Sequence, residues 1–305
     1  MAYDLVIIGA GPAGLAAGIY GARAKVNLLI VEREAPGGRV LTADKVENYP
    51  GFPEPVTGAE LIARMEAQAR RLGVAFKTVN VAEICQQEDG FLLRAMQENI
   101  AARAVILATG SGPTPLGVPG EKELRGRGVS YCAICDGFFF RDQQVAVVGG
   151  GDAAVQEAIY LTRFVEKVFL IHHHDSLRAA KSLQEQVFAD PKIEVIWNTE
   201  VREILGKDAV EGITVENLRS GERRMIPVKG VFVYIGVKPS SYLVRDLADL
   251  DQRGYVITDE SMATRTPGLF AAGDVRRKPL RQIITAVADG AVAAVSAEKF
   301  LRGRT

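Results

Sequence analysis

The chain has 305 residues, of which 48% are hydrophobic and 24% charged, and its 37 Lys and Arg are balanced by 37 Asp and Glu. A balanced charge argues against a nucleic-acid binder that works by neutralising phosphates, and the hydrophobic fraction excludes a globally disordered chain. Three cysteines are too few for a secreted disulfide-held fold, and three histidines in a single run exclude a catalytic triad or three-histidine metal site drawn from distant segments.

The first predicted unit spans residues 4–32: an apolar run, a Gly-rich turn, an Ala-rich segment of helical length and a second apolar run. Its turn carries Gly9, Gly11 and Gly14 in the pattern GxGxxG. The first Gly permits the tight turn, the second lets a pyrophosphate approach the backbone, and the third lets helix and strand pack closely. Glu32 ends the second run and can accept hydrogen bonds from ribose hydroxyls, with a solvated strand-end Glu as the alternative.

A CxxC pair, Cys132 and Cys135, follows in the middle of the chain. This spacing places both sulfurs on one face of a helical turn, close enough to bridge, and indicates a reversible redox pair. Asp136 could move a proton as a thiolate leaves. Half of a zinc site is the alternative, but zinc takes four ligands and there is no second CxxC. We expect Cys85 to be an inert strand thiol and Phe138–Phe140 to be a strand entering the core rather than a docking patch.

Residues 144–172 repeat the first unit, with Gly149, Gly151 and Ala154 in place of the three glycines. The first Gly of the turn and the last residue of the second strand are 23 positions apart in both units (9 to 32 and 149 to 172). The second unit ends in His172 instead of a carboxylate. Two nucleotide sites in one chain suggest a flavin and a nicotinamide cofactor, and hence an oxidoreductase.

Near the C-terminus, residues 266–274 are predicted to form a turn, a short apolar strand and a Gly-Asp pair, followed by a helix from Arg281. The end of that strand and the start of that helix would open toward a cofactor. Five apolar residues recur at helical spacing and are predicted to face the core: Ile283, Ile284, Val287, Ala291 and Val295.

With these residues in place, the chain resembles the low-molecular-weight thioredoxin reductase family, FAD-dependent pyridine nucleotide-disulfide oxidoreductases, over nearly its whole length. The motifs that carry the resemblance are GAGPAG (9–14), ENYPGF (47–52), LATG (107–110), CAICD (132–136), VGGGDAA (148–154) and LFAAGD (269–274) with Arg281 and Gln282. GGRV (37–40) departs slightly from the family's usual turn.

The resemblance assigns roles to individual positions. It implies that FAD is held by Gly9, Gly11, Pro12, Ala13, Gly14, Glu32, Gly38, Asn48, Gly110, Gly273, Asp274, Arg281, Gln282 and Ile283. It implies that the nicotinamide nucleotide is held by Gly149, Gly151, Asp152, Ala153, His172, His173, His174 and Arg178. Cys135 would face the flavin, Cys132 would exchange with the substrate disulfide, and Asp136 would be the acid.

The site for the 2′-phosphate of NADPH departs from the family. Relatives usually have His-Arg-Arg at the end of the second strand, whereas this chain has His172, His173 and His174, and only Arg178 of the usual cations remains. A histidine is mostly neutral at pH 7. Losing two charged hydrogen bonds would cost at most about 3–6 kcal/mol of NADPH binding, less if Arg178 or Lys181 compensates. We therefore expect NADH to be favoured over NADPH; the alternative is weaker NADPH binding through the histidines.

We predict an α/β fold of two Rossmann-like dinucleotide-binding domains, one inserted into the other. The FAD domain is expected at 1–113 and 239–305, and the domain with the nicotinamide nucleotide and the CxxC pair at 114–238. Pro113, Pro115 and Pro119 mark the first crossing. The length of the chain also favours two domains.

The predicted function is transfer of electrons from NADH or NADPH through FAD and the Cys132–Cys135 pair to thioredoxin or a thioredoxin-like protein. The alternatives are a flavin-dependent reductase fed by a ferredoxin-type donor, an oxidase that uses O₂, and a non-catalytic sensor. We expect no metal, no nucleic acid and no membrane partner. With no basic leader and no apolar stretch of about 18 residues, the chain is expected to be cytoplasmic, and a homodimer is expected from the resemblance alone.

Overall fold

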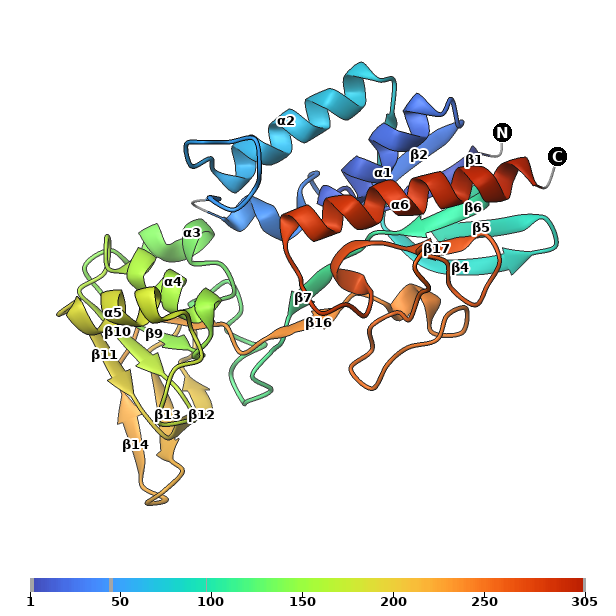
Figure 1. Cartoon of the computed structure of the whole chain (residues 1–305). Coiled ribbons are helices and arrows are strands. Elements are labelled where there is room, and N and C mark those ends of the chain that lie inside the picture. The colour runs from blue at the N-terminus through green and yellow to red at the C-terminus, as the bar shows by residue number, and fades with distance from the viewer. Residues whose placement is uncertain (1–2, 44–45, 97, 304–305) are drawn as a thin grey trace. The chain divides into compact units, whose positions relative to one another are not determined.

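The computed structural model describes residues 3–43, 46–96 and 98–303 (Figure 1). The chain divides into two compact units, each of which has its own core. Unit 1 comprises Met1–Gly112 and Lys238–Thr305, and unit 2 comprises Pro113–Val237. Helices pack on largely parallel sheets in both units, so the predicted α/β class is confirmed.

Unit 1 is built on a seven-stranded sheet in the order β3-β2-β1-β6-β5-β4, with β17 also paired to β6. The parallel strands are β1 (Tyr3–Ile8), β2 (Leu28–Glu32), β3 (Ala75–Thr78), β6 (Asn99–Leu107) and β17 (Leu269–Ala271). Two strands run antiparallel, β4 (Val81–Gln87) and β5 (Gly90–Ala95). The nine-residue strand β6 pairs with β5 through its first half and with β17 through its last three residues.

One face of this sheet is covered by the helices α1 (Pro12–Arg23), α2 (Gly58–Arg71) and α6 (Ile283–Arg302), which share a hydrophobic cluster with Leu5, Ile7 and Ile30 (Figure 1). The alternate strand residues, such as Val6 and Val31, belong to a second cluster. This alternation follows from the two-residue period of strand side chains. The described part of unit 1 also contains the short 3₁₀ turns η1 (Gly38–Thr42), η3 (Tyr242–Val244) and η4 (Gly273–Val275).

The buried face of α6 differs in part from the predicted one, because Ile283 and Val287 pack against the core as expected but other predicted residues do not. Ile284 and Val295, which were expected in the core, are 40% and 42% exposed. The helix instead buries a row of mostly small residues: Ala286, Asp289, Gly290, Ala293, Ala294, Ala297 and Leu301. The reason is its close approach to α1, because a Cβ at Gly290 would lie 2.0 Å from the carbonyl oxygen of Ala13. Large side chains on that face would hold the two helices apart.

Unit 2 has a five-stranded parallel sheet in the order β11-β10-β9-β15-β8. Its strands are β8 (Val129–Ser130), β9 (Gln144–Val148), β10 (Lys167–Ile171), β11 (Ile193–Ile196) and β15 (Gly230–Val233). An antiparallel sheet adds β12 (Thr199–Leu205), β13 (Gly212–Asn217) and β14 (Arg223–Ile226). The helices are α3 (Ala133–Asp136), α4 (Asp152–Leu161) and α5 (Lys181–Ala189), with a 3₁₀ turn η2 (Gly137–Phe140).

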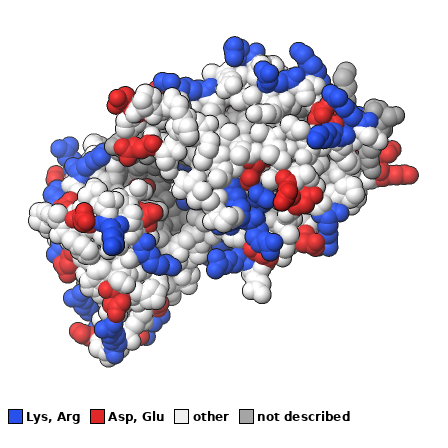
Figure 2. Space-filling model, viewed as in Figure 1, with Lys and Arg blue, Asp and Glu red and all other residues white. Residues whose placement is uncertain are grey.

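The chain passes between the units through two short strands, β7 (Ser111–Pro113) and β16 (Val237–Pro239), which pair with each other. The N–H of Thr114 donates to the carbonyl of Gly236 at 2.9 Å just beyond them. No described helix is both long enough and apolar enough to cross a membrane. Positive and negative side chains are interspersed over the face seen in Figure 2, in keeping with the zero net charge.

Candidate functional site

The first Gly-rich turn has the geometry that its spacing predicts. Gly9 has a φ of +107°, and a Cβ there would lie 2.4 Å from the carbonyl oxygen of Ala108. A Cβ at Gly14 would lie 1.8 Å from the carbonyl oxygen of Gly9. At Gly11, which caps α1 ahead of Pro12, the nearest atom to a Cβ would be 3.9 Å away. Only Gly11 thus leaves open space at the start of the helix, where a phosphate could approach.

Glu32 lies at the end of β2, next to this turn. Its Oε2 accepts a hydrogen bond from the N–H of Ala10 at 2.8 Å, and its Oε1 accepts from the N–H of Arg33 at 2.8 Å. The carboxylate is therefore fixed at the carboxyl edge of the sheet, where the second lone pairs of its oxygens can accept from a ribose.

Four parallel strands, in the order β2-β1-β6-β17, end at this same edge. Hydrogen bonds continue beyond the strands, from Ala108 N to Ile8 O at 2.8 Å and from Ala272 N to Leu107 O at 2.9 Å. The edge thereby brings together the Gly9 turn, Glu32, Gly110 and the Gly273–Asp274 pair. Ligands of open parallel sheets bind at such carboxyl ends.

Gly38 and Gly110 also border this edge. Gly38 has a φ of +58°, and a Cβ there would lie 3.9 Å from the Cα of Gly11. The preceding Gly37 donates its N–H to the carbonyl of Ala10 at 2.9 Å, which fixes this loop against the turn. Gly110 has a φ of +66°, and nothing lies within 4 Å of its Cβ position. Gly11, Gly38 and Gly110 therefore leave the space at their Cβ positions open at this edge.

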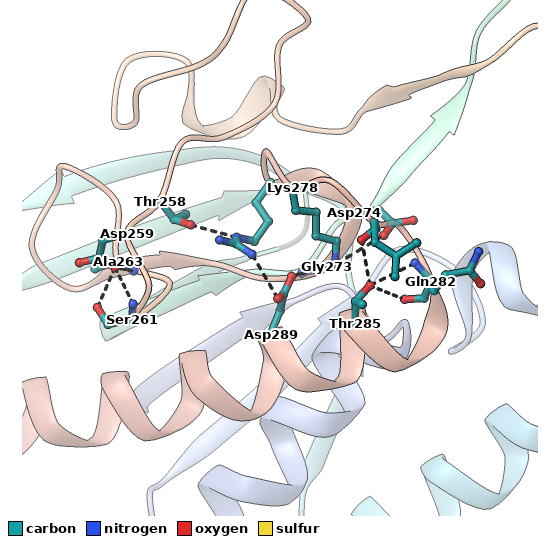
Figure 3. Close-up of polar contacts among 12 residues, drawn as sticks. Thr258, Asp259, Ser261, Ala263, Gly273, Asp274, Lys278, Gln282, Thr285 and Asp289 are labelled. Atoms are coloured by element: carbon teal, nitrogen blue, oxygen red, sulfur yellow. Dashed lines mark hydrogen bonds and ion pairs between the residues drawn. The ribbon is translucent and has the colours of Figure 1, made fainter. Parts of the chain in front are cut away.

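Asp274 is held at the same edge by a network that the sequence did not reveal (Figure 3). The buried carboxylate of Asp289, on α6, accepts from Gly273 N at 3.1 Å, from Arg276 at 3.2 Å and from Lys278 Nζ at 2.9 Å. This network fixes the η4 turn and thus the backbone of Asp274.

The Asp274 side chain is largely buried. Its Oδ1 has no hydrogen-bond partner among the described residues, and Lys278 Nζ is 3.9 Å away. Burial raises the pKa of Asp274, and the positive charge of Lys278 opposes that rise. Buried carboxylate oxygens normally have a partner, so Asp274 is suited to accept from the hydroxyls of a bound ligand.

The remaining residues assigned to this site lie at the start of α6. Gln282 caps the helix in a capping box with Thr285, and its Oε1 accepts from Asn48 Nδ2 at 3.1 Å. Arg281 stacks its guanidinium 3.9 Å from the ring centroid of Tyr255. Ile283 is the first residue of the helix. Unit 1 thus joins Asn48 and Gln282, which are 234 positions apart, and the whole site fits a dinucleotide.

The second Gly-rich turn repeats this geometry in unit 2. Gly149 has a φ of +148°, and a Cβ there would lie 2.4 Å from the carbonyl oxygen of Tyr234. Gly151 caps α4, and nothing lies within 4 Å of its Cβ position. Asp152, the first residue of α4, accepts from Ala180 N at 2.7 Å. The open start of α4 matches that of α1 and suits a second nucleotide.

The three histidines after β10 do not share one environment. His172 is only 1% exposed, and a Cβ at Gly150 would lie 2.4 Å from its ring. Neither ring nitrogen has a hydrogen-bond partner among the described residues. Burial lowers the pKa of His172 to about 4, assisted by His173, His174 and Arg178 and opposed by the backbone of Ser176. His172 is therefore a packed residue beneath the turn, although the sequence assigned it to the exposed nucleotide-binding set.

His173, His174 and Arg178 are exposed, as a nucleotide-facing set requires. Burial lowers the pKa of His173, and the charges of His174 and Arg178 lower it further, while Glu200 opposes them. The N–H of Arg178 donates to the carbonyl of Gly150 at 2.7 Å, so this loop lies against the turn. Among the described residues, no group of three or more His, Cys, Asp or Glu is arranged to hold a metal ion.

Cys132 and Cys135 form a disulfide at the start of α3, which confirms the predicted pairing. Cys135 is exposed and Cys132 is half-buried. Ser130, at the end of β8, joins the pair to the predicted acid. Its Oγ accepts from Cys132 N at 3.0 Å and donates to Asp136 Oδ2 at 2.6 Å. No sequence pattern identified this serine, because its role depends on contacts formed only in the folded loop. Cys85 is a free thiol in β4, as expected.

Two tyrosines hold the residues on either side of Cys132. Tyr234 Oη accepts from Ala133 N at 2.8 Å. Tyr131 donates from its hydroxyl to the buried Glu121 at 2.7 Å, and desolvation together with Glu121 raises the pKa of Tyr131 to about 12. Glu121 also accepts from the N–H groups of Leu116 and Gly117 at 2.7 Å each.

The aromatic run after the redox pair is not the core strand that the sequence suggested. Phe138 and Phe139 are 61% and 75% exposed in the turn η2. Phe140 alone enters the core, where its ring packs edge-on against Phe232. The turn separates the three side chains, because in a 3₁₀ turn they point in different directions.

The chain is similar to known proteins over nearly its whole length. The family described as "Pyridine nucleotide-disulphide oxidoreductase" matches residues 3–290. A thioredoxin reductase from Peptoclostridium litorale is 47% identical over 305 residues, with 98% of this chain and 97% of that protein covered. One from Bacillus subtilis is 44% identical over 300 residues, with 98% and 95% covered. The crystal structure of Lactococcus lactis thioredoxin reductase, in the FR conformation, has a TM-score of 0.94 and 43% identity, and 99% of each chain is covered.

Proposed function

This chain belongs to the pyridine nucleotide-disulphide oxidoreductase family and is an FAD-dependent disulfide reductase with a nicotinamide nucleotide as electron donor, and we propose that it prefers NADH and reduces a thioredoxin-like protein. The predicted fold of two Rossmann-like domains is confirmed by the match to thioredoxin reductase structures. The observation that carries the proposal is the Cys132–Cys135 disulfide, which lies in the same unit as the open Gly151 turn.

We assign FAD to unit 1, corresponding to the expected domain 1–113 and 239–305. The open Gly11 position and the unpartnered Oδ1 of Asp274 fit such a ligand. Gly11 would receive the pyrophosphate, Glu32 the ribose hydroxyls, and Asp274 the hydroxyls of the linking chain. Asn48 and Gln282 would stay joined beside it. When bound, FAD supplies the two-electron chemistry between the nucleotide and the disulfide.

The residues of unit 2, corresponding to the expected domain 114–238, act on the disulfide and the nucleotide. Gly149, Gly151, Asp152 and Ala153 would hold the nicotinamide nucleotide at the start of α4. Once the disulfide is reduced, the Cys132 thiolate attacks a sulfur of the partner's disulfide and forms a mixed disulfide. The Cys135 thiolate then attacks Cys132 and releases the partner as a dithiol. Asp136, held by Ser130, exchanges the proton with the thiols.

The preference for NADH is supported by the small positive charge at the end of β10. His172 is buried with a pKa of about 4, and the lowered pKa of His173 leaves it neutral at pH 7. Arg178 is exposed, while Arg219 is paired with Asp175 at 2.6 Å. Charged donors form the strongest hydrogen bonds to a 2′-phosphate. NADPH therefore lacks here the additional binding affinity that two arginines would provide.

A protein acceptor is supported by the exposed aromatic pair beside the disulfide. Phe138 and Phe139 expose most of their side chains three and four residues after Cys135. Exposed aromatic side chains next to a reactive group are typical of surfaces that bind proteins. The relatives named thioredoxin reductase support a thioredoxin-like protein as that partner. A cytoplasmic location, where thiols are mostly reduced, suits such a reaction.

A homodimer is supported by the exposed apolar face of α6. Ile284, Val292 and Val295 are 39–42% exposed along one side of the helix, and Tyr20 on the neighbouring helix α1 is 48% exposed. Contiguous exposed apolar side chains of this kind are typical of subunit interfaces. Measurement of the mass in solution by light scattering tests this: a value near 66 kDa, twice the 32.9 kDa of the chain, supports it, and the monomer mass contradicts it.

Anaerobic titration of the purified protein with NADH and separately with NADPH tests the donor, with the flavin absorbance as the signal. NADH is expected to bleach the flavin at a concentration at least about tenfold lower than NADPH. Equal concentrations, or a lower one for NADPH, would contradict the NADH preference. Bleaching by neither nucleotide would favour a ferredoxin-type donor. Thioredoxin as acceptor is tested in the same preparation by multiple turnover, which a sensor would not show.

A further inference from the structure

Three neighbouring strands of unit 2 end beside the two reactive segments of that unit. In the order β9-β15-β8, all three run parallel, with Val233 opposite Val148 and Phe232 opposite Ser130. The nucleotide turn begins after β9, and the redox pair follows β8. Tyr234 directly follows β15, the strand between them, so the topology brings it to a position between both segments.

The backbone of Tyr234 lies against the nucleotide turn. Its N–H donates to the carbonyl of Val148 at 2.8 Å, and its own carbonyl oxygen would be 2.4 Å from a Cβ at Gly149. Only glycine fits at that position, where φ is +148°. The main chain of Tyr234 and the first Gly of the turn are thus packed without space between them.

The side chain of Tyr234 reaches the redox pair instead. Its hydroxyl accepts the N–H of Ala133 at 2.8 Å, and Ala133 is fully buried between the two cysteines in sequence. The ring packs with the cluster that contains Ala133, Ala154 and Phe232. A buried N–H without an acceptor is costly, so this hydroxyl stabilises the loop in the conformation seen with the disulfide closed.

We propose that Tyr234 is a positioning residue that fixes the Cys132–Cys135 disulfide relative to the nucleotide turn through the hydrogen bond from Ala133 to its hydroxyl. The functional meaning of this positioning rests on the proposed disulfide reduction. The effect of the hydrogen bond on the Cys132–Cys135 disulfide does not depend on that proposal. Loss of the hydroxyl removes an interaction of the closed disulfide and shifts the thiol–disulfide equilibrium toward the dithiol.

The test is the equilibrium between the FAD-containing protein and glutathione redox buffers, with the thiols of Cys132 and Cys135 trapped by alkylation and counted by mass spectrometry. Tyr234→Phe is expected to shift the equilibrium constant about three- to ten-fold toward the dithiol, or about 15–30 mV for a two-electron couple. Tyr242→Phe is the control, because it removes a hydroxyl from a half-exposed tyrosine of unit 1. The control should match the native protein.

Tyr234→Leu removes the aromatic ring as well as the hydroxyl. Comparison with Tyr234→Phe therefore distinguishes the effect of the hydroxyl from that of ring packing. If the hydroxyl carries the effect, both variants shift the equilibrium to a similar extent. A shift in the Leu variant alone assigns the effect to ring packing and overturns the proposal, as does an unchanged equilibrium in Tyr234→Phe. This measurement needs neither a nucleotide nor a protein partner, so it stands or fails independently of the proposed donor and acceptor.

A second measurement shows whether the effect is confined to the disulfide. Ferricyanide takes electrons from the reduced flavin and bypasses the disulfide. Turnover of NADH with ferricyanide and the KM for NADH should stay within about two-fold of native in Tyr234→Phe, because the variant keeps the backbone that packs against Gly149. Turnover with a disulfide acceptor should fall by a larger factor than turnover with ferricyanide. An equal fall in both would indicate a general structural defect and overturn the proposal.

Discussion

Oγ of Ser130 lies 2.6 Å from Oδ2 of Asp136, and this same Oγ accepts the N–H of Cys132 at 3.0 Å. One buried serine thus holds both the first cysteine and the acid that follows the second. A hydroxyl has one proton to donate, and the short contact assigns it to the carboxylate rather than to the carbonyl of Cys132 at 3.2 Å.

Replacement of this serine should slow disulfide reduction. Ser130→Ala removes the hydrogen bond to Asp136 and the acceptor of the Cys132 N–H, so neither residue is held as in the native loop. Turnover with a disulfide acceptor should fall by about tenfold, whereas turnover with ferricyanide, which bypasses the disulfide, should stay native. Ser130→Thr keeps the hydroxyl and should retain the native rate. An unchanged rate with the disulfide acceptor in the Ala variant would remove Ser130 from the mechanism.

The open Gly151 position gives a direct test of the nucleotide site. Because no atom lies within 4 Å of its Cβ position, Gly151→Ala should fold normally, retain FAD and keep the native disulfide equilibrium. The added methyl group would meet a bound pyrophosphate, so the KM for NADH should rise by about tenfold or more. Steady-state kinetics at fixed acceptor concentration measure this. An unchanged KM would place the nucleotide elsewhere.

The burial of His172 makes stability depend on pH. Its pKa is held at about 4 in the folded protein, against 6.5 for an exposed histidine. The unfolded chain therefore takes up this proton first as the pH falls. The stabilising contribution is complete above pH 6.5 and is lost between pH 6.5 and about 4. Between pH 8 and pH 5 the native protein should lose about 2 kcal/mol of unfolding free energy through this residue.

His172→Leu is the matched variant, because leucine cannot take up a proton and can fill the space beneath Gly150. Urea unfolding of both proteins at pH 8 and pH 5 isolates the effect: the native protein should lose about 2 kcal/mol more than the variant. Equal losses in the two proteins would mean that His172 takes up its proton in the folded state as readily as in the unfolded chain.

The exposed side chains of Phe138 and Phe139 should contribute to binding of a protein substrate and not to turnover with a small acceptor. The double change to Ala removes apolar surface that is already in contact with water, so folding stability should change little. The KM for thioredoxin should rise by about tenfold or more, whereas turnover with ferricyanide should stay native. A parallel loss with both acceptors would show that the pair supports the fold rather than the partner.

The parts of the molecule that sequence reasoning predicted are those in which a local pattern determines the geometry. Gly9 and Gly149 must adopt positive φ wherever the turn forms, and Cys132 and Cys135 are near each other in any helical turn. The contacts that the sequence did not reveal join distant segments: Ala133 to Tyr234 across 101 positions, and Gly273 to Asp289 across 16.

Burial explains the other differences. His172 and His173 are adjacent and chemically alike, but His172 directly follows a strand whose last four residues are buried, and it packs beneath Gly150. On α6 the apolar period was read correctly as helical, and Ile283 and Val287 pack against the core as predicted, but Ile284 and Val295 face outward. Large apolar residues normally identify the core face, but here the close contact with Ala13 demands small ones such as Gly290.

Electron transfer from NADH to the disulfide is tested by anaerobic reduction of the FAD-containing protein with NADH, followed by acid quenching, alkylation and mass spectrometry of Cys132 and Cys135. Both cysteines of the native protein should become alkylated once the flavin is bleached, and Cys135→Ser should bleach without reducing any acceptor protein. Bleaching of the native flavin with the Cys132–Cys135 disulfide left intact, or acceptor reduction by Cys135→Ser at the native rate, would contradict this route.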